Sequence, residues 1–66
     1  MNGVIVKYDS GKAYGFIRGD GMRHDTFFHK RAMVGGITPA VDMIVQFVEE
    51  LDQSSGRIRA TNVRPI

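Results

Sequence analysis

The chain has 66 residues, carries a net charge of +2 and contains no cysteine. This length allows one small domain over residues 1–66, and the lack of thiols excludes both a disulfide framework and a thiolate zinc site. No segment has the composition of a signal peptide or approaches the roughly 20 apolar residues that a membrane span needs. We therefore expect a soluble, cytoplasmic monomer with no membrane partner.

Five apolar or alternating segments follow one another along the chain, separated by breaks rich in Gly, Asp, Ser and Pro. The segments span residues 3–8, 14–18, 23–29, 43–51 and 57–64. Valine, isoleucine, phenylalanine and threonine dominate them, a composition typical of short strands joined by turns. The fourth segment also has helical spacing, but its β-branched residues and its alternation favour a strand. A single helical turn is expected at about residues 31–34.

Five short strands without disulfides need a closed or nearly closed sheet, because open sheet edges pair with other chains. The sequence therefore predicts an all-β domain, a small five-stranded antiparallel barrel of the OB-fold type.

The second and third segments place aromatic side chains at alternating positions. Tyr14 and Phe16 share one face of a strand, and the next strand puts Phe27 and His29 on one face. A short turn joins the two strands, so an antiparallel register can bring all four side chains together. Ile17 and Phe28 would then point into the core. Gly15, between the two aromatics, costs strand stability, a trade more natural at a binding surface.

Aromatic pairs on adjacent strands are often core residues, and this alternative has to be weighed. Both faces of these two strands carry apolar residues, however, and a small barrel has only one interior. One set of rings must therefore lie outside. Exposed rings among Lys and Arg suit single-stranded nucleic acid, because bases stack on them at roughly 1–3 kcal/mol per base while cations contact phosphates.

The charges are unevenly distributed along the chain. Residues 1–31 carry six basic and three acidic side chains, and residues 57–66 carry three basic side chains and no acidic one. Residues 32–56 carry four acidic side chains and no basic one. If the first and last thirds share a face, that face is positive and the opposite region is negative, which favours a polyanionic partner.

Two motifs resemble those of the cold-shock domain family. Residues 12–17 (KAYGFI) resemble its K-G-F-G-F-I motif, and residues 26–29 (TFFH) resemble its V-F-V-H motif. Spacing along the flanks agrees as well, including the A-x-N-V pattern at residues 60–63, so the resemblance covers essentially the whole chain. The RNA-recognition motif begins similarly but needs two helices, for which this chain has no room.

The resemblance implies an OB-type barrel that binds single-stranded RNA or DNA with little sequence preference, with an RNA-chaperone or gene-regulatory role. Carried over by position, the residues that it implies for binding are Tyr8, Lys12, Tyr14, Phe16, Phe27 and His29. We expect stacking on the rings, with Lys7, Lys12 and Lys30 contacting the phosphates.

The chain departs from the family pattern at four places. Lys7 stands where the family has a tryptophan, and Lys30 stands where an aromatic commonly follows the motif histidine. Ala13 replaces a glycine, and residues 33–40 lack the usual aromatic. Weaker binding per nucleotide and a steeper salt dependence are expected. The alternative is a protein-interaction module on the same scaffold, with nucleic-acid binding reduced or lost.

Other combinations of polar residues predict no further chemistry. His24 and His29 point to opposite faces of a strand and lack a fourth ligand nearby, so no metal is expected. The adjacent Glu49 and Glu50 point to different faces, and the serines lie in turns without a base, so we expect neither an enzyme nor a cofactor. The arginines at positions 57 and 59 share one face of the last strand, as a solvated edge or as an extension of the positive groove.

Overall fold

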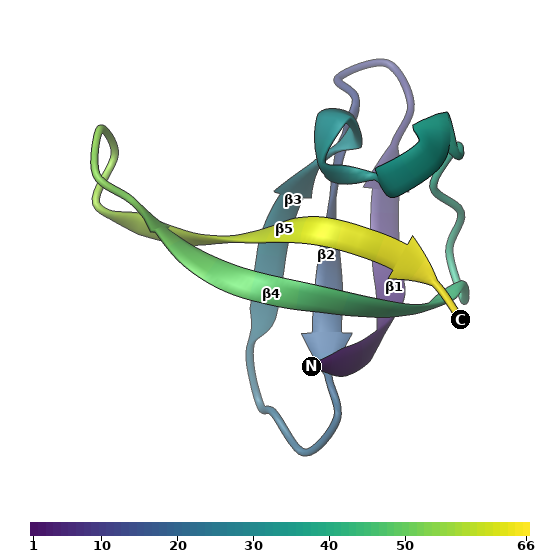
Figure 1. Cartoon of the computed structure of the whole chain (residues 1–66), viewed down its shortest axis with the longest axis horizontal. Helices are drawn as coiled ribbons and strands as arrows, with labels where there is room; N and C mark the ends of the chain where they lie inside the picture. The colour runs from purple at the N-terminus through teal and green to yellow at the C-terminus, as the bar shows by residue number, and fades with distance from the viewer.

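The computed structural model describes residues 1–66 and shows a five-stranded sheet closed into a barrel (Figure 1). The strands and the two single-turn 3₁₀ helices are, in chain order, β1 (Asn2–Asp9), β2 (Tyr14–Gly19), β3 (Asp25–His29), η1 (Lys30–Ala32), η2 (Val34–Gly36), β4 (Ile44–Asp52) and β5 (Arg57–Pro65). The predicted all-β barrel is confirmed, and each strand differs from its predicted bounds by one or two residues at most. The structure contains no helix with the length and apolarity that crossing a membrane would require.

Around the barrel the strands follow the order β1-β2-β3-β5-β4. Four of the neighbouring pairs are antiparallel, but β3 and β5 run parallel and share one register pair, Phe27 with Arg59. The predicted antiparallel barrel is therefore confirmed except at the seam between β3 and β5. The reason is topological, because strand directions cannot alternate all the way around a closed ring with an odd number of strands.

Every strand contributes to the core inside the barrel. The buried hydrophobic side chains are Ile5, Ile17, Phe28, Met33, Val45, Phe47, Ala60 and Val63. The prediction that Ile17 and Phe28 point inward is confirmed, since both are fully buried. Met33 lies between η1 and η2 and forms an isolated bridge with Val63, so the two 3₁₀ turns sit against one end of the barrel.

Gly15 lies on the inner face of β2, where it is buried and pairs with Phe28. A Cβ atom built on this glycine would stand 2.2 Å from the backbone oxygen of Lys7, because β1 shifts register between Ile5 and Lys7 and its backbone passes close to β2 there. The interpretation of this glycine as a binding-surface feature is therefore wrong. It is required by close strand packing inside the barrel.

Candidate functional site

The outer face of β2 and β3 carries four half-buried ring side chains, which we call the aromatic surface: Tyr14, Phe16, Phe27 and His29. The predicted register is confirmed, since Tyr14 pairs with His29 and Phe16 pairs with Phe27. The ring centroids of Tyr14 and Phe27 are 5.5 Å apart, and those of Phe16 lie 6.1 Å from each of the other two. These separations place the three rings in mutual contact, with the remaining ring surface open to a ligand.

The imidazole of His29 has a defined orientation. Its Nδ1 accepts a hydrogen bond of 3.0 Å from the backbone N–H of Arg31, which caps η1. A nitrogen that accepts carries no proton, so the neutral ring bears its hydrogen on Nε2. Nε2 has no hydrogen-bond partner within the chain and is available to donate to a base or a phosphate.

Three exposed lysines lie around the aromatic surface. Lys7 pairs with Phe16 across β1 and β2, which places it on the same face as that ring. Lys30 directly follows His29 and begins η1, and Lys12 lies in the turn that leads into β2. None of the three takes part in an ion pair, so their charges are free to meet a polyanion.

Tyr8 lies apart from the aromatic surface. It pairs with Gly15, whose position faces the barrel interior, and its ring stacks on Phe28 with a centroid distance of 6.2 Å and an interplanar angle of 17°. The bulge in β1 produces this placement, because a register shift after Ile5 changes which of the following residues face inward. Tyr8 therefore packs against the core, and the structure does not bring it together with the other predicted ring residues.

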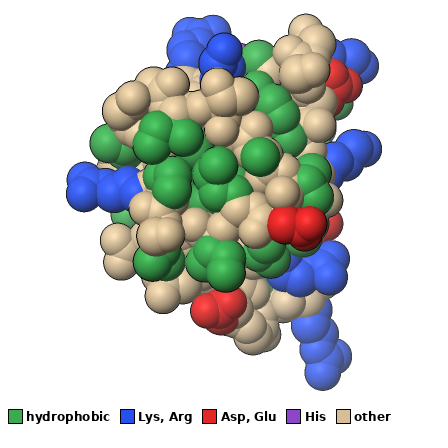
Figure 2. Space-filling view, turned by 90° about the vertical axis from the view of Figure 1, so that its right-hand side faces the viewer, with side chains coloured by type: hydrophobic (Ala, Val, Ile, Leu, Met, Phe, Trp, Pro, Cys, Tyr) green, Lys and Arg blue, Asp and Glu red, His purple; other side chains and the backbone are tan.

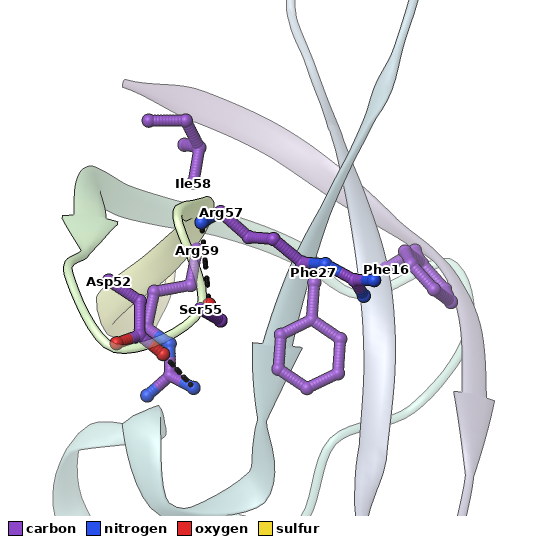
Figure 3. A pocket seen from close by; sticks show the side chains of 7 residues that line it. All are labelled: Phe16, Phe27, Asp52, Ser55, Arg57, Ile58 and Arg59. Atoms are coloured by element: carbon purple, nitrogen blue, oxygen red, sulfur yellow. Dashed lines mark hydrogen bonds and ion pairs between the residues drawn. The ribbon is translucent and has the colours of Figure 1, made fainter.

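The β4–β5 hairpin brings two arginines to the edge of the aromatic surface, as Figure 3 shows. The guanidinium carbon of Arg59 lies 5.9 Å from the centroid of the Phe27 ring. Arg57 extends from β5 toward Phe16 and Phe27. Together with the end of the hairpin, these side chains border a hollow of about 390 Å³, lined by Phe16, Phe27, Asp52, Ser55, Arg57, Ile58 and Arg59. Of the two interpretations of the arginines, the geometry favours an extension of the groove.

Asp52 forms an ion pair with Arg59. One carboxylate oxygen, Oδ2, lies 3.2 Å from an Arg59 guanidinium nitrogen, and the other accepts hydrogen bonds from the hydroxyl of Ser54 at 2.7 Å and its backbone N–H at 3.1 Å. The Ser54 hydroxyl, the Ser54 backbone and then the charge of Arg59 hold the pKa of Asp52 below its ordinary value of 3.8, against an opposing effect of burial. Asp52 is therefore ionised at neutral pH. Sequence reasoning missed it, because only the parallel seam places β5 and its ion pair beside Phe27.

The charge pattern differs from the expectation in one respect. The basic last segment forms β5, which pairs along its length with β4, the strand that holds three of the four acidic residues of the middle segment. Glu50 is the direct partner of Arg59, for example. The negative segment is thus not confined to a region opposite the positive one.

The polar residues considered for a metal site do not converge. The structure contains no group of three or more His, Cys, Asp or Glu side chains placed to hold a metal ion. His24 lies on the exposed part of the chain before β3, where its Nε2 is 3.9 Å from a carboxylate oxygen of Glu49. That carboxylate also accepts a hydrogen bond of 2.7 Å from the buried Thr26 hydroxyl, so its contacts link β3 to β4.

Comparison with protein families and curated proteins gives one match. A family model described as "'Cold-shock' DNA-binding domain" matches residues 1–66, the whole chain. No curated protein matches it.

Proposed function

Since the chain belongs to the "cold-shock" DNA-binding domain family, a family of nucleic-acid-binding domains, we propose that it binds single-stranded RNA or DNA without catalysing a reaction. The observation that carries this proposal is the aromatic surface, where three mutually contacting rings and a histidine lie on the outside of the barrel. Bases of a single strand stack on such rings, and every base offers a π-face. Little sequence preference is therefore expected.

The cations around the rings supply the second part of the interaction. Lys7, Lys12 and Lys30 are exposed and make no ion pair, so each can contact a phosphate without first leaving a carboxylate. Two of them, Lys7 and Lys30, replace rings of the family pattern, which shifts the balance from stacking toward charge. The affinity of this chain should accordingly depend steeply on salt.

A weak, sequence-tolerant binder of single strands is suited to keeping RNA unpaired. We therefore propose an RNA-chaperone or gene-regulatory role, carried out by a monomer in the cytoplasm. Within this proposal Tyr14, Phe16 and Phe27 stack, His29 stacks or donates from Nε2, and the three lysines hold the backbone. Tyr8 contributes by supporting Phe28 behind the binding face.

A protein-interaction module on the same scaffold is the second candidate, and one observation favours it. Figure 2 shows hydrophobic side chains gathered on the face of the barrel that lies to the right in Figure 1. Ile44 and Ile66 are exposed, and a hydrogen bond of 3.0 Å from the Ile66 N–H to the Ile44 oxygen places them side by side. Val4 is the register partner of Ile44 on β1. An apolar face of this kind can receive a protein partner.

A titration separates the two candidates. A short, pyrimidine-rich oligonucleotide carrying a fluorescent label is titrated with the parent chain and with Phe16→Ala and Phe27→Ala, at low and at physiological salt. The label is required because the chain has no tryptophan. Each loss of a stacked ring is expected to weaken binding by about tenfold. Ile44→Ala, which removes an exposed apolar side chain outside the aromatic surface, is the control and should leave the affinity unchanged.

Two results would contradict the proposal in different ways. Undetectable binding by the parent chain at low salt would remove nucleic acid as the ligand and favour a protein partner. Full affinity in both phenylalanine variants would leave binding purely electrostatic and exclude stacking on the aromatic surface.

A further inference from the structure

Arg59 differs from the lysines around the aromatic surface because its charge is already engaged. Its guanidinium lies over the Phe27 ring and contacts Asp52 through one nitrogen–oxygen pair at 3.2 Å. The side chains of Arg59 and Asp52 are 44% and 21% exposed, so water competes for this ion pair. Only one of the three guanidinium nitrogens contacts Asp52, so the N–H groups of the other two can still donate hydrogen bonds to a ligand.

We propose that Arg59 binds a phosphate of the nucleic-acid strand, and that the Asp52 carboxylate occupies the guanidinium in place of that phosphate when the strand is absent. The inference rests on the proposed function. A carboxylate and a phosphate oxygen are equivalent partners for a guanidinium, since both are anionic acceptors that match its donors. A strand that reaches the edge of the aromatic surface thus meets Arg59 and exchanges one anion for another.

The exchange leaves the Asp52 carboxylate with hydrogen bonds to one of its two oxygens. Asp52 keeps its hydrogen bonds from the hydroxyl and the backbone N–H of Ser54 after Arg59 has moved away. The departure of the guanidinium also uncovers the Phe27 ring surface over which it lies. One side-chain movement therefore supplies a cation for a phosphate and a ring surface for a base.

A second hollow offers a place for the phosphate. It is bordered by η1 and β5, and Arg59 lines it as well as the hollow beside Phe27. His29 and Arg31 line the same second hollow. Arg31 makes no ion pair and His29 has its Nε2 free, so three residues with hydrogen-bond donors line one space. A nucleic-acid strand with a base stacked on Phe27 would accordingly pass over β5 into this hollow.

The test compares two variants that remove the same charge from the same face of β4. Asp52→Asn removes the carboxylate that contacts the Arg59 guanidinium. Glu50→Gln is the matched control, because Glu50 lies two residues away on the same face, opposite Arg59 in the register of β4 and β5, and its carboxylate accepts from the Thr61 hydroxyl and makes no ion pair with Arg59. Any general gain from removing a negative charge appears in both variants. Asp52→Asn is expected to bind the labelled oligonucleotide about fivefold more tightly than Glu50→Gln, the upper range for an exposed ion pair.

Arg59→Gln supplies the second arm of the test. It should weaken binding and lower the slope of log affinity against log salt by about 0.7, the value for one phosphate contact on a single strand. In the Arg59→Gln background the advantage of Asp52→Asn over Glu50→Gln should vanish, because there is no guanidinium left to release. An NMR titration of the unaltered chain should also shift the Arg59 Nε–H resonance.

The outcomes distinguish this inference from the proposed function. Equal affinities of Asp52→Asn and Glu50→Gln, an advantage that persists without Arg59, or an unchanged Arg59 resonance at saturation would each overturn the exchange. If the parent chain binds and Phe27→Ala weakens that binding, the proposed function stands even when the exchange fails. If the parent chain does not bind, the proposed function itself is wrong.

Discussion

The β2–β3 pair and the β4–β5 pair are both antiparallel hairpins, but they use their faces differently. In β2–β3, Ile17 and Phe28 are fully buried on one side while the aromatic surface covers the other. The β4–β5 strands are longer, and their outer part extends beyond the rest of the barrel in Figure 1. There the cross-strand partners Leu51 and Ile58 are 57% and 50% exposed. A hairpin whose inner face is packed against the core holds its outer rings at fixed positions. A hairpin that extends beyond the core presents long side chains that can change their partners.

The largest effect on stability is expected when two adjacent phenylalanines of β3 are compared. Phe28→Ala should lower the free energy of unfolding by about 3–5 kcal/mol, because it empties a fully buried site in the core. Phe27→Ala should cost about 1 kcal/mol, the loss of its ring contacts with Tyr14 and Phe16. Urea denaturation measures both values. Equal losses would show that the two faces of β3 are not divided between core and ligand.

A substitution in the turn that leads into β2 should have an effect of intermediate size on stability. Ala13 has a φ of +61°, a conformation that costs a residue with a Cβ atom roughly 1 kcal/mol, and its carbonyl accepts a hydrogen bond of 2.8 Å from the Lys30 N–H. Ala13→Gly should therefore raise the free energy of unfolding by about 1 kcal/mol. The control is Ala40→Gly, which has no positive φ to relieve and should be neutral or destabilising. A destabilising Ala13→Gly would contradict the assignment of strain to this turn.

The smallest expected effect concerns the β4–β5 hairpin and its dependence on pH. The pKa of Asp52 is lowered on folding, so its contribution to stability is present above the unfolded value and is lost as pH falls through the folded one. Thermal unfolding of the parent and of Asp52→Asn should therefore differ at neutral pH, by an amount that starts to shrink at about pH 4. Ser54→Ala, which removes the hydroxyl that is the largest cause of the shift, should lessen the pH dependence. A difference that is constant from neutral pH to about pH 2 would contradict the prediction.

The aromatic surface was predictable because its residues lie close together in the sequence. Tyr14, Phe16, Phe27 and His29 alternate within two short segments joined by one turn, so strand periodicity and a single register place them together. The position of Tyr8 relative to them could not be predicted, since a bulge in β1 reverses which residues face inward and leaves no mark in the composition of the segment. Bulges depend on how two strands pack, as the close approach of Lys7 to the glycine at position 15 shows.

The contact of Phe27 with Arg59 could not be predicted residue by residue, because it joins segments that lie 32 positions apart, 59 minus 27, across the seam. The parallel orientation of that seam was available in principle. A closed ring of five strands cannot alternate its directions, so at least one parallel pair is unavoidable. Periodicity could not predict which two strands form that pair. It therefore could not predict that Asp52 and Phe27 line the same hollow.

The single register pair between β3 and β5 also bears on how the barrel opens. The neighbouring strands elsewhere are joined by ladders, but here Phe27 and Arg59 alone are in register. Local opening therefore begins most readily at this junction, and amide hydrogens beside it should exchange with solvent sooner than those between β1 and β2. A nucleic-acid strand lying across the junction would contact both β3 and β5, which few backbone contacts join directly. Its binding would then slow amide hydrogen exchange at the junction and hold the two strands together.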